Sequence, residues 1–261
     1  ILMNKFIVLD INHGGDYLAS ILKDRGYEVI VYDTYQTRGE KRQEINKKNI
    51  QVIDSVERNY IDYTIVHPVH CPEHFLSSFS DNKKLTHHEL VKFLFNGKNN
   101  VIEITGSKGK TTTAHILAYL LSFDDEVFLN SSMGFETFLK GKARVLDENN
   151  SISAGYTAKI LSEHNKMPQV LEESLGICGV GNISILTSTN PVYKIKGGNS
   201  NSLEAKKQLF KLSEDKIIID GKDKIANDLA DESRKEVIRI WEDVRIELPD
   251  YLEIGKDVQS S

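Results

Sequence analysis

The sequence predicts an α/β protein in which a Rossmann-like parallel-sheet domain, residues 1–97, precedes a second α/β domain, residues 98–261. Two observations support this class. Short apolar runs, typical of buried parallel strands, alternate along the chain with stretches of helical periodicity. One of these strands also leads through a glycine-rich loop into a helix, which is the order of elements in a phosphate-binding loop.

Composition narrows the possible partners and setting. The 261 residues carry 33 lysines and arginines against 38 aspartates and glutamates, a formal net charge of −5. Nucleic-acid binding needs a basic surface, so we expect no nucleic-acid partner. No apolar run approaches the roughly 18 residues of a membrane span, so we expect no membrane partner, and we expect no secretory signal. Because Cys71 and Cys178 are the two cysteines, we expect a soluble, cytoplasmic protein without disulfides.

The first strand, turn and helix belong to a predicted βαβ unit. Residues 6–11 are an almost continuous apolar run, apolar residues at 17–22 recur at helical spacing, and a second strand follows at 29–31. Gly14 and Gly15 do not complete the G-x-G-x-x-G pattern, so we expect no dinucleotide site of that kind. The start of the helix could still hold an anionic group.

Two polar clusters in the first domain allow more than one interpretation. The basic segment 38–48 is typical of a solvated face, and it could also contact a polyanionic substrate. Three histidines follow a strand predicted near 61–66: His67, His70 and His74. Two more, His87 and His88, lie at the start of a helix predicted to run to residue 95. Imidazoles at such spacing can bind a transition metal, but they match no standard zinc pattern. We favour helix capping, core packing or substrate contact.

A phosphate-binding loop is predicted at the start of the second domain. A short strand at 101–104 is followed by Thr-Gly-Ser-Lys-Gly-Lys-Thr-Thr-Thr and a helix with apolar residues, Leu120 among them, on one face. In this arrangement, successive backbone N–H groups and the helix N-terminus point at phosphates. Lys110 would reach the β- and γ-phosphates, and Thr111 would offer its hydroxyl to Mg²⁺. Ile104 stands where the general pattern has its first glycine.

The shortened form of this loop is informative. It has the pattern T-G-x-x-G-K-T-T-T, which resembles the ATP loop of the Mur ligase family. The resemblance implies a Mur-type P-loop NTPase central domain that uses ATP and Mg²⁺ to convert a substrate carboxylate into an acyl phosphate, with release of ADP. The nucleotide-binding residues that it implies are Thr105, Gly106, Ser107, Lys108, Gly109, Lys110, Thr111 and Thr112.

Two segments downstream of the loop also resemble the family. Leu-Glu-Glu-Ser-Leu at 171–175 is similar to the family pattern L-E-x-S-S, which implies that Glu172 is the Mg²⁺ carboxylate and Glu173 its neighbour. A strand predicted at 183–190 ends in Thr-Asn, as in the family. The Asp-His that follows in the family is replaced here by Pro-Val, which argues against a second-metal histidine and for a divergent branch.

Two arguments draw attention to Lys206. On a helical projection of residues 203–212, Lys206 falls inside the arc of apolar residues, whereas Lys207 falls outside it. An inward lysine needs a partner or a lowered pKa. The segment also resembles the family helix whose carbamylated lysine helps to bind a second Mg²⁺; a lysine that reaches from the helix edge to solvent is the alternative. The resemblance thus implies Lys110, Glu172 and Lys206 as catalytic residues, and Thr111, Glu172 and Lys206 at the metal.

The N-terminal segment narrows the resemblance to one branch. Leu-Asp-Ile-Asn-His-Gly-Gly at 9–15 is similar to the start of archaeal Mur-like enzymes of nickel tetrapyrrole biosynthesis in methanogens. That branch implies a small-molecule substrate, an anionic nickel tetrapyrrole, whose propionate is activated by ATP and then attacked by a ring carbon. The substrate contacts that we expect are His13, Gly14, Gly15, Arg38 and His70.

Two other functions stay open at this point. One is an amide-forming Mur-type ligase that acts on cell-wall peptides or polyglutamate. The other is a non-catalytic nickel- or tetrapyrrole-binding module that uses the histidines. The Mur architecture places a C-terminal domain after the ATP domain, and because few residues follow Lys206, we expect this chain to lack that domain.

Overall fold

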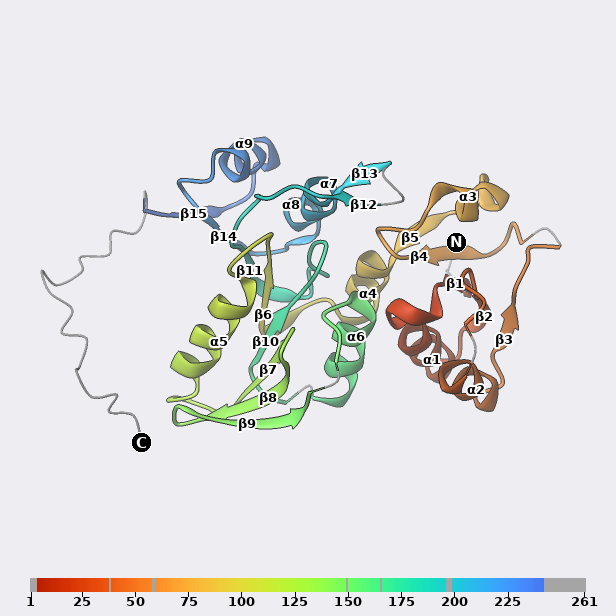
Figure 1. Cartoon of the computed structure of the whole chain (residues 1–261), viewed down its shortest axis with the longest axis horizontal. Helices are drawn as coiled ribbons and strands as arrows, with labels where there is room; N and C mark the ends of the chain where they lie inside the picture. The colour runs from red at the N-terminus through yellow and green to blue at the C-terminus, as the bar shows by residue number, and fades with distance from the viewer. Residues whose placement is uncertain are drawn as a thin grey trace, which may run out of the picture.

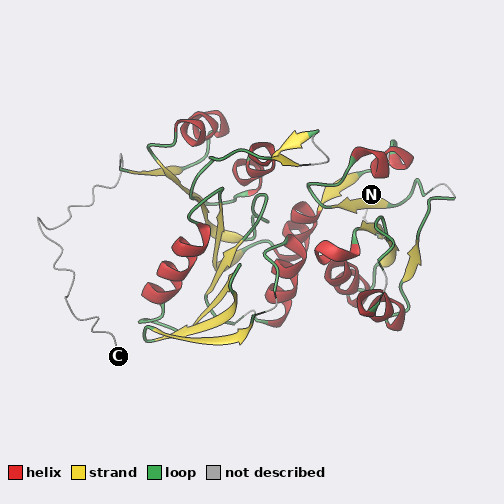
Figure 2. Ribbon diagram, in the orientation of Figure 1, coloured by secondary structure: helices red, strands yellow, loops and turns green. Residues whose placement is uncertain are grey.

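The computed structural model describes residues 4–37, 39–57, 60–148, 150–164, 166–195 and 199–241. The chain forms two main sheets with helices around them (Figures 1 and 2). Arg38, an expected substrate contact, lies outside the described residues. None of the helices in the described part of the chain combines the length and the apolar character that a membrane span requires.

The first sheet has five parallel strands in the order β3-β2-β1-β4-β5. Its central strand β1 is a run of fully buried apolar side chains, as the sequence predicts, although it ends at Leu9 and Ile11 already starts a one-turn helix, η1. The strands are β1 (Lys5–Leu9), β2 (Glu28–Tyr32), β3 (Gln51–Ile53), β4 (Thr64–His67) and β5 (Lys84–Thr86). The helices are η1 (Ile11–Gly15), α1 (Asp16–Asp24), α2 (Glu40–Lys47), α3 (Glu73–Leu76), η2 (Ser77–Phe79) and α4 (His87–Phe95).

The second sheet has eight strands in the order β15-β14-β11-β6-β10-β7-β8-β9. It is parallel from β15 to β7, and β8 and β9 add an antiparallel edge. The strands are β6 (Lys98–Thr105), β7 (Val127–Ser131), β8 (Gly134–Leu139), β9 (Lys142–Asp147), β10 (Gln169–Glu172), β11 (Gly181–Leu186), β14 (Lys216–Asp220) and β15 (Val237–Ile240). Two parallel α/β sheets in succession confirm the predicted fold class.

The remaining elements are five helices and a short hairpin. They are α5 (Lys110–Leu121), α6 (Ala154–Glu163), α7 (Ser202–Lys206), α8 (Gln208–Leu212), α9 (Lys224–Ser233), β12 (Lys194–Ile195) and β13 (Ser200–Asn201). The helix predicted around Lys206 is therefore divided at Lys207. The apolar face predicted for α5 is wrong at Leu120, which is 56% exposed. Ala114 and Ala118 are buried under the helix, and Leu117 and Leu121 pack against the same core.

The two sheets share one apolar core. Phe6 and Val8 of β1 belong to the same buried cluster as Leu90 of α4, Ala158 of α6 and Leu171 of β10. Helices α4 and α6 contact each other, and α6 also contacts α1, so helices fill the space between the sheets (Figure 1). This packing fixes the first sheet against the second and defines the walls of the sites between them.

Candidate active site

The predicted phosphate loop has the expected backbone form. Strand β6 ends at Thr105 and helix α5 starts at Lys110, so the glycine-rich segment links a strand to a helix. Gly109 has a φ of 82°, a left-handed conformation that favours glycine. A Cβ on Gly106 would lie 2.1 Å from the Thr187 hydroxyl oxygen, so only glycine fits this close approach.

A second loop braces the phosphate loop. The N–H groups of Ser107 and Lys108 donate to the carbonyl and the hydroxyl of Ser188, each at 2.9 Å. The Thr187 hydroxyl donates to the Lys108 carbonyl at 2.6 Å. These contacts need a loop after β11, so the strand predicted at 183–190 is wrong at its end: β11 stops at Leu186 and the following residues form the loop. The glycine-rich segment is thus held rigidly before any ligand binds.

The N-terminus of α5 is available to an anion. No side chain caps this helix within the described structure. The first backbone N–H of the helix that has a helical acceptor is that of Thr113, which donates to the Gly109 carbonyl. The N–H groups of Lys110, Thr111 and Thr112 precede it and have no helical acceptor. Together with the helix dipole, they favour a bound phosphate at this point.

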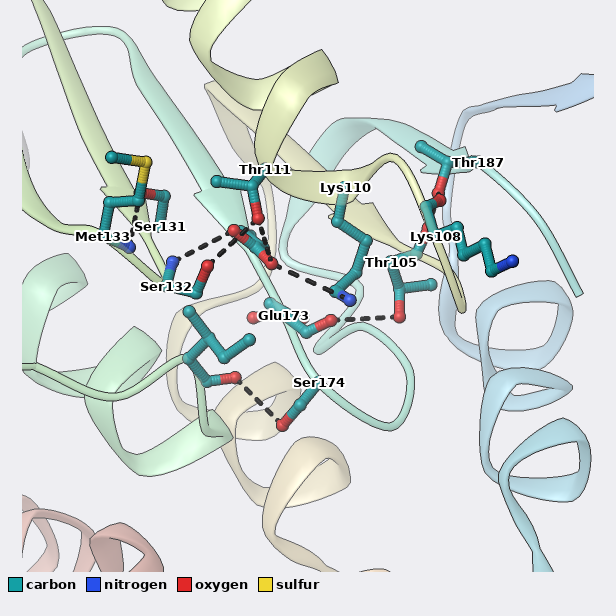
Figure 3. Close-up of polar contacts among 12 residues, drawn as sticks. Thr105, Lys108, Lys110, Thr111, Ser131, Ser132, Met133, Glu173, Ser174 and Thr187 are labelled. Atoms are coloured by element: carbon teal, nitrogen blue, oxygen red, sulfur yellow. Dashed lines mark hydrogen bonds and ion pairs between the residues drawn. The ribbon is translucent and has the colours of Figure 1, made fainter. Parts of the chain in front are cut away.

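Glu172 lies directly opposite this helix start. One of its carboxylate oxygens accepts from the Thr111 hydroxyl at 3.1 Å and lies 3.8 Å from the Lys110 ammonium. The other accepts from the Ser132 backbone N–H at 3.0 Å. The Thr111 and Ser132 hydroxyls are 3.0 Å apart (Figure 3). A buried carboxylate with two hydroxyls is a set of hard oxygen donors, so these residues fit Mg²⁺ beside a nucleotide phosphate.

Glu173 points away from this cluster. Its carboxylate accepts from the Thr157 hydroxyl at 2.6 Å and from the Cys178 N–H at 2.8 Å, and it is fully buried. Burial and the nearby Glu103 charge hold the pKa of Glu173 well above its usual range. Glu103 accepts four backbone N–H groups from residues 178–181. These two acids organise the turn before β11, and the phosphate site is left to Glu172.

Lys206 is buried, as the helical projection predicts, with 1% of its surface exposed. Its ammonium lies 3.4 Å from the Ser202 carbonyl and 5.1 Å from the centre of the Tyr193 ring. No carboxylate lies within ion-pair distance of it among the described residues. Burial, followed by repulsion from Lys110, lowers the pKa of Lys206 to about 8. Two cationic side chains therefore converge near the phosphate loop, an arrangement that attracts a polyanion.

A pocket of about 530 Å³ opens between the two sheets. On one side lie loops that follow strands of the first sheet, where β1 has β2 and β4 as its neighbours. This is the switch point at which open α/β sheets bind ligands. The residues lining it are His13, Tyr35, Pro68, Val69, His70, Pro72, His87, His88, Ser151, Ser153, Ala154, Ser174, Leu175, Tyr193 and Ile195.

Two of the expected substrate contacts line this pocket and two do not. His13 and His70 lie in its wall, with ring centres 4.5 Å apart. Gly14 and Gly15 are buried beside it, where the backbone leaves no room for a side chain. A Cβ on Gly14 would lie 2.7 Å from Gly155 Cα, and one on Gly15 would lie 2.2 Å from the Asp10 carbonyl. These glycines shape the loop rather than the pocket surface.

The other histidines have separate surroundings. His87 donates to the Leu9 carbonyl at 3.0 Å, and burial lowers its pKa to about 3. His88 is also buried, with a pKa lowered by burial to about 4, and both line the pocket as neutral rings. His67 donates to the Pro68 carbonyl, and His74 is exposed on α3. Of the five histidines, the structure brings His70, His87 and His88 into the wall of one pocket, whereas His67 and His74 are not among its lining residues.

Several residues of the site escape sequence reasoning. Ser132, Thr187 and Ser188 follow strands β7 and β11, and their positions at strand ends are the signal that could have identified them. Tyr193 lies between the pocket and Lys206, and no motif marks it.

Two curated proteins are similar in sequence to most of this chain. No family model matches the chain. Coenzyme F(430) synthetase of Methanosarcina acetivorans is 30% identical over 221 residues, 78% of this chain and 47% of that protein. The chain resembles the coenzyme F(430) synthetases. The protein of that name from Methanocaldococcus jannaschii is 29% identical over 225 residues, 80% of this chain and 50% of that protein.

These two relatives confirm the resemblance to the branch that the N-terminal motif predicts. The chain spans about half the length of these two coenzyme F(430) synthetases. Among solved structures, UDP-N-acetylmuramate:L-alanyl-gamma-D-glutamyl-meso-diaminopimelate ligase (MPL) of Neisseria meningitides aligns with a TM-score of 0.48 and 15% identity, over 91% of this chain and 78% of that one. UDP-N-acetylmuramoyl-L-alanyl-D-glutamate–2,6-diaminopimelate ligase aligns with a TM-score of 0.46 and 16% identity, over 81% and 45%. The fold itself rests on the sheet topology described above.

Proposed function

We propose that this chain carries the nucleotide and substrate sites of an ATP-dependent ligase that completes coenzyme F(430). The observation that carries the proposal is the convergence of Lys110, Thr111 and Glu172 at the uncapped start of α5. That arrangement suits a nucleotide triphosphate with Mg²⁺. The likeness to the coenzyme F(430) synthetases supports the choice of substrate.

The proposed reaction has two steps. A propionate carboxylate of the nickel seco-precursor attacks the γ-phosphorus of ATP, which gives an acyl phosphate and ADP. A ring carbon then loses a proton and attacks the acyl carbon, so that a carbon–carbon bond forms and inorganic phosphate leaves. No separate amine is consumed, which distinguishes this reaction from amide ligation.

The residues of the chain stabilise the first step through positioning and charge. The N–H groups at the start of α5 and the Lys110 ammonium hold the phosphates, and Lys206 adds a second cation near them. Thr111 and Glu172 would hold Mg²⁺, which neutralises phosphate charge when bound. We further propose that the lowered pKa of Lys206 allows its carbamylation, since a neutral amine is the form that reacts with carbon dioxide. The carbamate is an anion, so in that form Lys206 would help to hold Mg²⁺ and would no longer act as a cation beside the phosphates.

The pocket adjoins the phosphate site. Tyr193 lines the pocket and also lies under the Lys206 ammonium. Ser174 lines it as well, two residues after Glu172. A substrate bound against His13 and His70 would thus reach towards the phosphates with its carboxylate. In this proposal Arg38 contacts a further carboxylate of the same substrate.

The test is ADP release by the full-length protein with the seco-precursor, ATP and Mg²⁺. We expect release that depends on the precursor, and loss of release in Lys110→Ala. Lys142→Ala, which removes an exposed lysine on β9, is the matched control and should behave like the wild type. ADP release that is no higher with the precursor than without it would refute the proposal. Release that depends on an added amino acid would identify an amide-forming ligase instead.

A further inference from the structure

A group of three polar side chains lies at the wall of the pocket on the first sheet. Asp10 follows β1, and 1% of its surface is exposed. Its Oδ1 accepts the N–H groups of Asn12 at 2.9 Å and His13 at 3.3 Å, which fixes the carboxylate and leaves Oδ2 towards the histidines. His13 Nδ1 lies 2.5 Å from Oδ2, and His70 Nε2 lies 3.8 Å from it.

Two further observations indicate that this group is built for a ligand. Asp10 has a φ of 71°, which a residue with a side chain rarely adopts, and such conformations concentrate at functional sites. His70 Nε2 is buried and has no hydrogen-bond partner among the described residues. A buried polar atom without a partner is costly, so a ligand at this point would relieve a real penalty.

We propose that Asp10, His13 and His70 bind a divalent transition-metal ion of the nickel, cobalt or zinc class. A donor set of two imidazoles and a carboxylate favours these ions over Mg²⁺. One ligand atom from each residue lies within 4.8 Å of the others. Ligands at about 2 Å from one ion are about 3 to 4 Å apart, so small side-chain rotations complete the site.

Binding of the ion changes the His13–Asp10 pair in a defined way. The hydrogen bond between His13 Nδ1 and Asp10 Oδ2 gives way to two metal bonds, and the proton on His13 Nδ1 leaves to solvent. Lys41 is a cation near this group, with its ammonium 3.2 Å from the Asn12 carbonyl and 3.6 Å from Asp16. Its charge opposes the ion, but its ammonium is directed at these other groups.

A second group of possible ligands lacks this character. Glu103, Glu173 and Cys178 also lie within 4.8 Å of one another. Their carboxylate oxygens, however, already accept hydrogen bonds from residues 178–181 and from Thr157. The buried orphan atom of His70 has no counterpart there, which is why the proposal concerns the first group.

The ion would face the pocket. Asp10, His13 and His70 supply one donor atom each, and the remaining coordination positions are open to a ligand from the pocket side. Binding of the ion does not depend on the proposed reaction. Its role, to hold a carboxylate of the anionic substrate, does rest on the proposed function.

The test is calorimetric titration of the protein with Ni²⁺ and Co²⁺ in the presence of excess Mg²⁺. We expect one ion per chain, and at least about tenfold weaker binding in His13→Ala and in His70→Ala. His74→Ala removes an exposed imidazole elsewhere and should keep the wild-type affinity. Equal affinity in the wild type and in a His13→Ala, His70→Ala double variant would overturn the proposal, as would binding lost equally in His74→Ala.

A second measurement needs no variant in the site. In NMR spectra of the wild type, paramagnetic Co²⁺ should shift or broaden the imidazole signals of His13 and His70 and leave that of His74 unchanged. A uniform effect on all histidines would contradict a specific site. Lys110→Ala should lose nucleotide binding but keep the ion, so failure of the proposed function and failure of the metal site give different results.

Discussion

Lys206 allows a prediction in which loss of a functional side chain makes the protein more stable. The lysine is buried without a carboxylate partner, and burial and Lys110 lower its pKa from 10.5 to about 8. At neutral pH the lysine is charged in both the folded and the unfolded chain. The free-energy cost of burying this charge therefore destabilises the folded state. A shift of this size corresponds to at most about 3 kcal/mol. Lys206→Met keeps the apolar stem and removes the charge, so we expect a gain of about 1 to 3 kcal/mol at pH 7.

The pH dependence gives the prediction its sign. Because the folded pKa is lower than the unfolded one, the unfolded chain binds more protons between pH 8 and 10.5, and the wild type gains stability as pH rises through this range. The cost of the charge falls from about 3 kcal/mol at pH 7 to about 1 kcal/mol at pH 9.5. The gain in unfolding free energy of Lys206→Met over the wild type should therefore be smaller at pH 9.5 than at pH 7 by the same amount.

The assay is urea unfolding of wild type and variant at both pH values, in buffer free of carbon dioxide so that the lysine is not carbamylated. Lys207→Met is the matched control, because the neighbouring lysine is partly exposed and pairs with Glu204 at 2.8 Å, and it should change stability by less than about 1 kcal/mol. Equal unfolding free energies for wild type and Lys206→Met at both pH values would refute the account of a buried, destabilised ammonium.

Three further predictions concern the supports of the site. Glu103→Ala leaves three buried N–H groups, those of residues 179–181, without an acceptor, while the Cys178 N–H keeps Glu173; it should cost at least about 3 kcal/mol in urea unfolding, whereas loss of the exposed Glu163 carboxylate should cost little, and equal effects would be contrary to the structure. Gly155→Ala places a Cβ 2.2 Å from the Gly14 carbonyl and should lower the melting temperature by several degrees; an unchanged value would show that the backbones are not in close approach. Thr111→Val should raise the Mg²⁺ concentration needed for nucleotide binding, measured by titration, and an unaltered requirement would remove Thr111 from the metal site.

The phosphate loop was predictable because its residues are contiguous. Strand, glycine loop and helix follow one another from residue 101 to 121, so local chemistry specifies the turn and the exposed N–H groups. Lys206 was predictable for a related reason, since helical periodicity alone places it inward. Glu172 was predicted from the resemblance to the family pattern alone, and its place beside the phosphate loop depends on the pairing of β10 with β6.

Other features depend on contacts between distant segments, which a single sequence does not display. The histidines resemble one cluster along the chain, yet His87 contacts β1 and His67 contacts its own loop. Asp10 lies in the N-terminal motif, but its link to His70 exists only because β1 and β4 are neighbours in the sheet. Leu120 has the periodicity of a core residue, but it is exposed, whereas α5 packs through its alanines and through Leu117 and Leu121.

The central claim is that the loop before α5 binds a nucleotide triphosphate through Lys110. The most direct measurement is the affinity of the protein for ATP with Mg²⁺, compared between wild type and Lys110→Ala, with Lys142→Ala as the control. The account predicts saturable binding in the wild type and the control, and at least about tenfold weaker binding in Lys110→Ala because a charge-assisted phosphate contact is lost. Identical ATP affinity in all three proteins would contradict it.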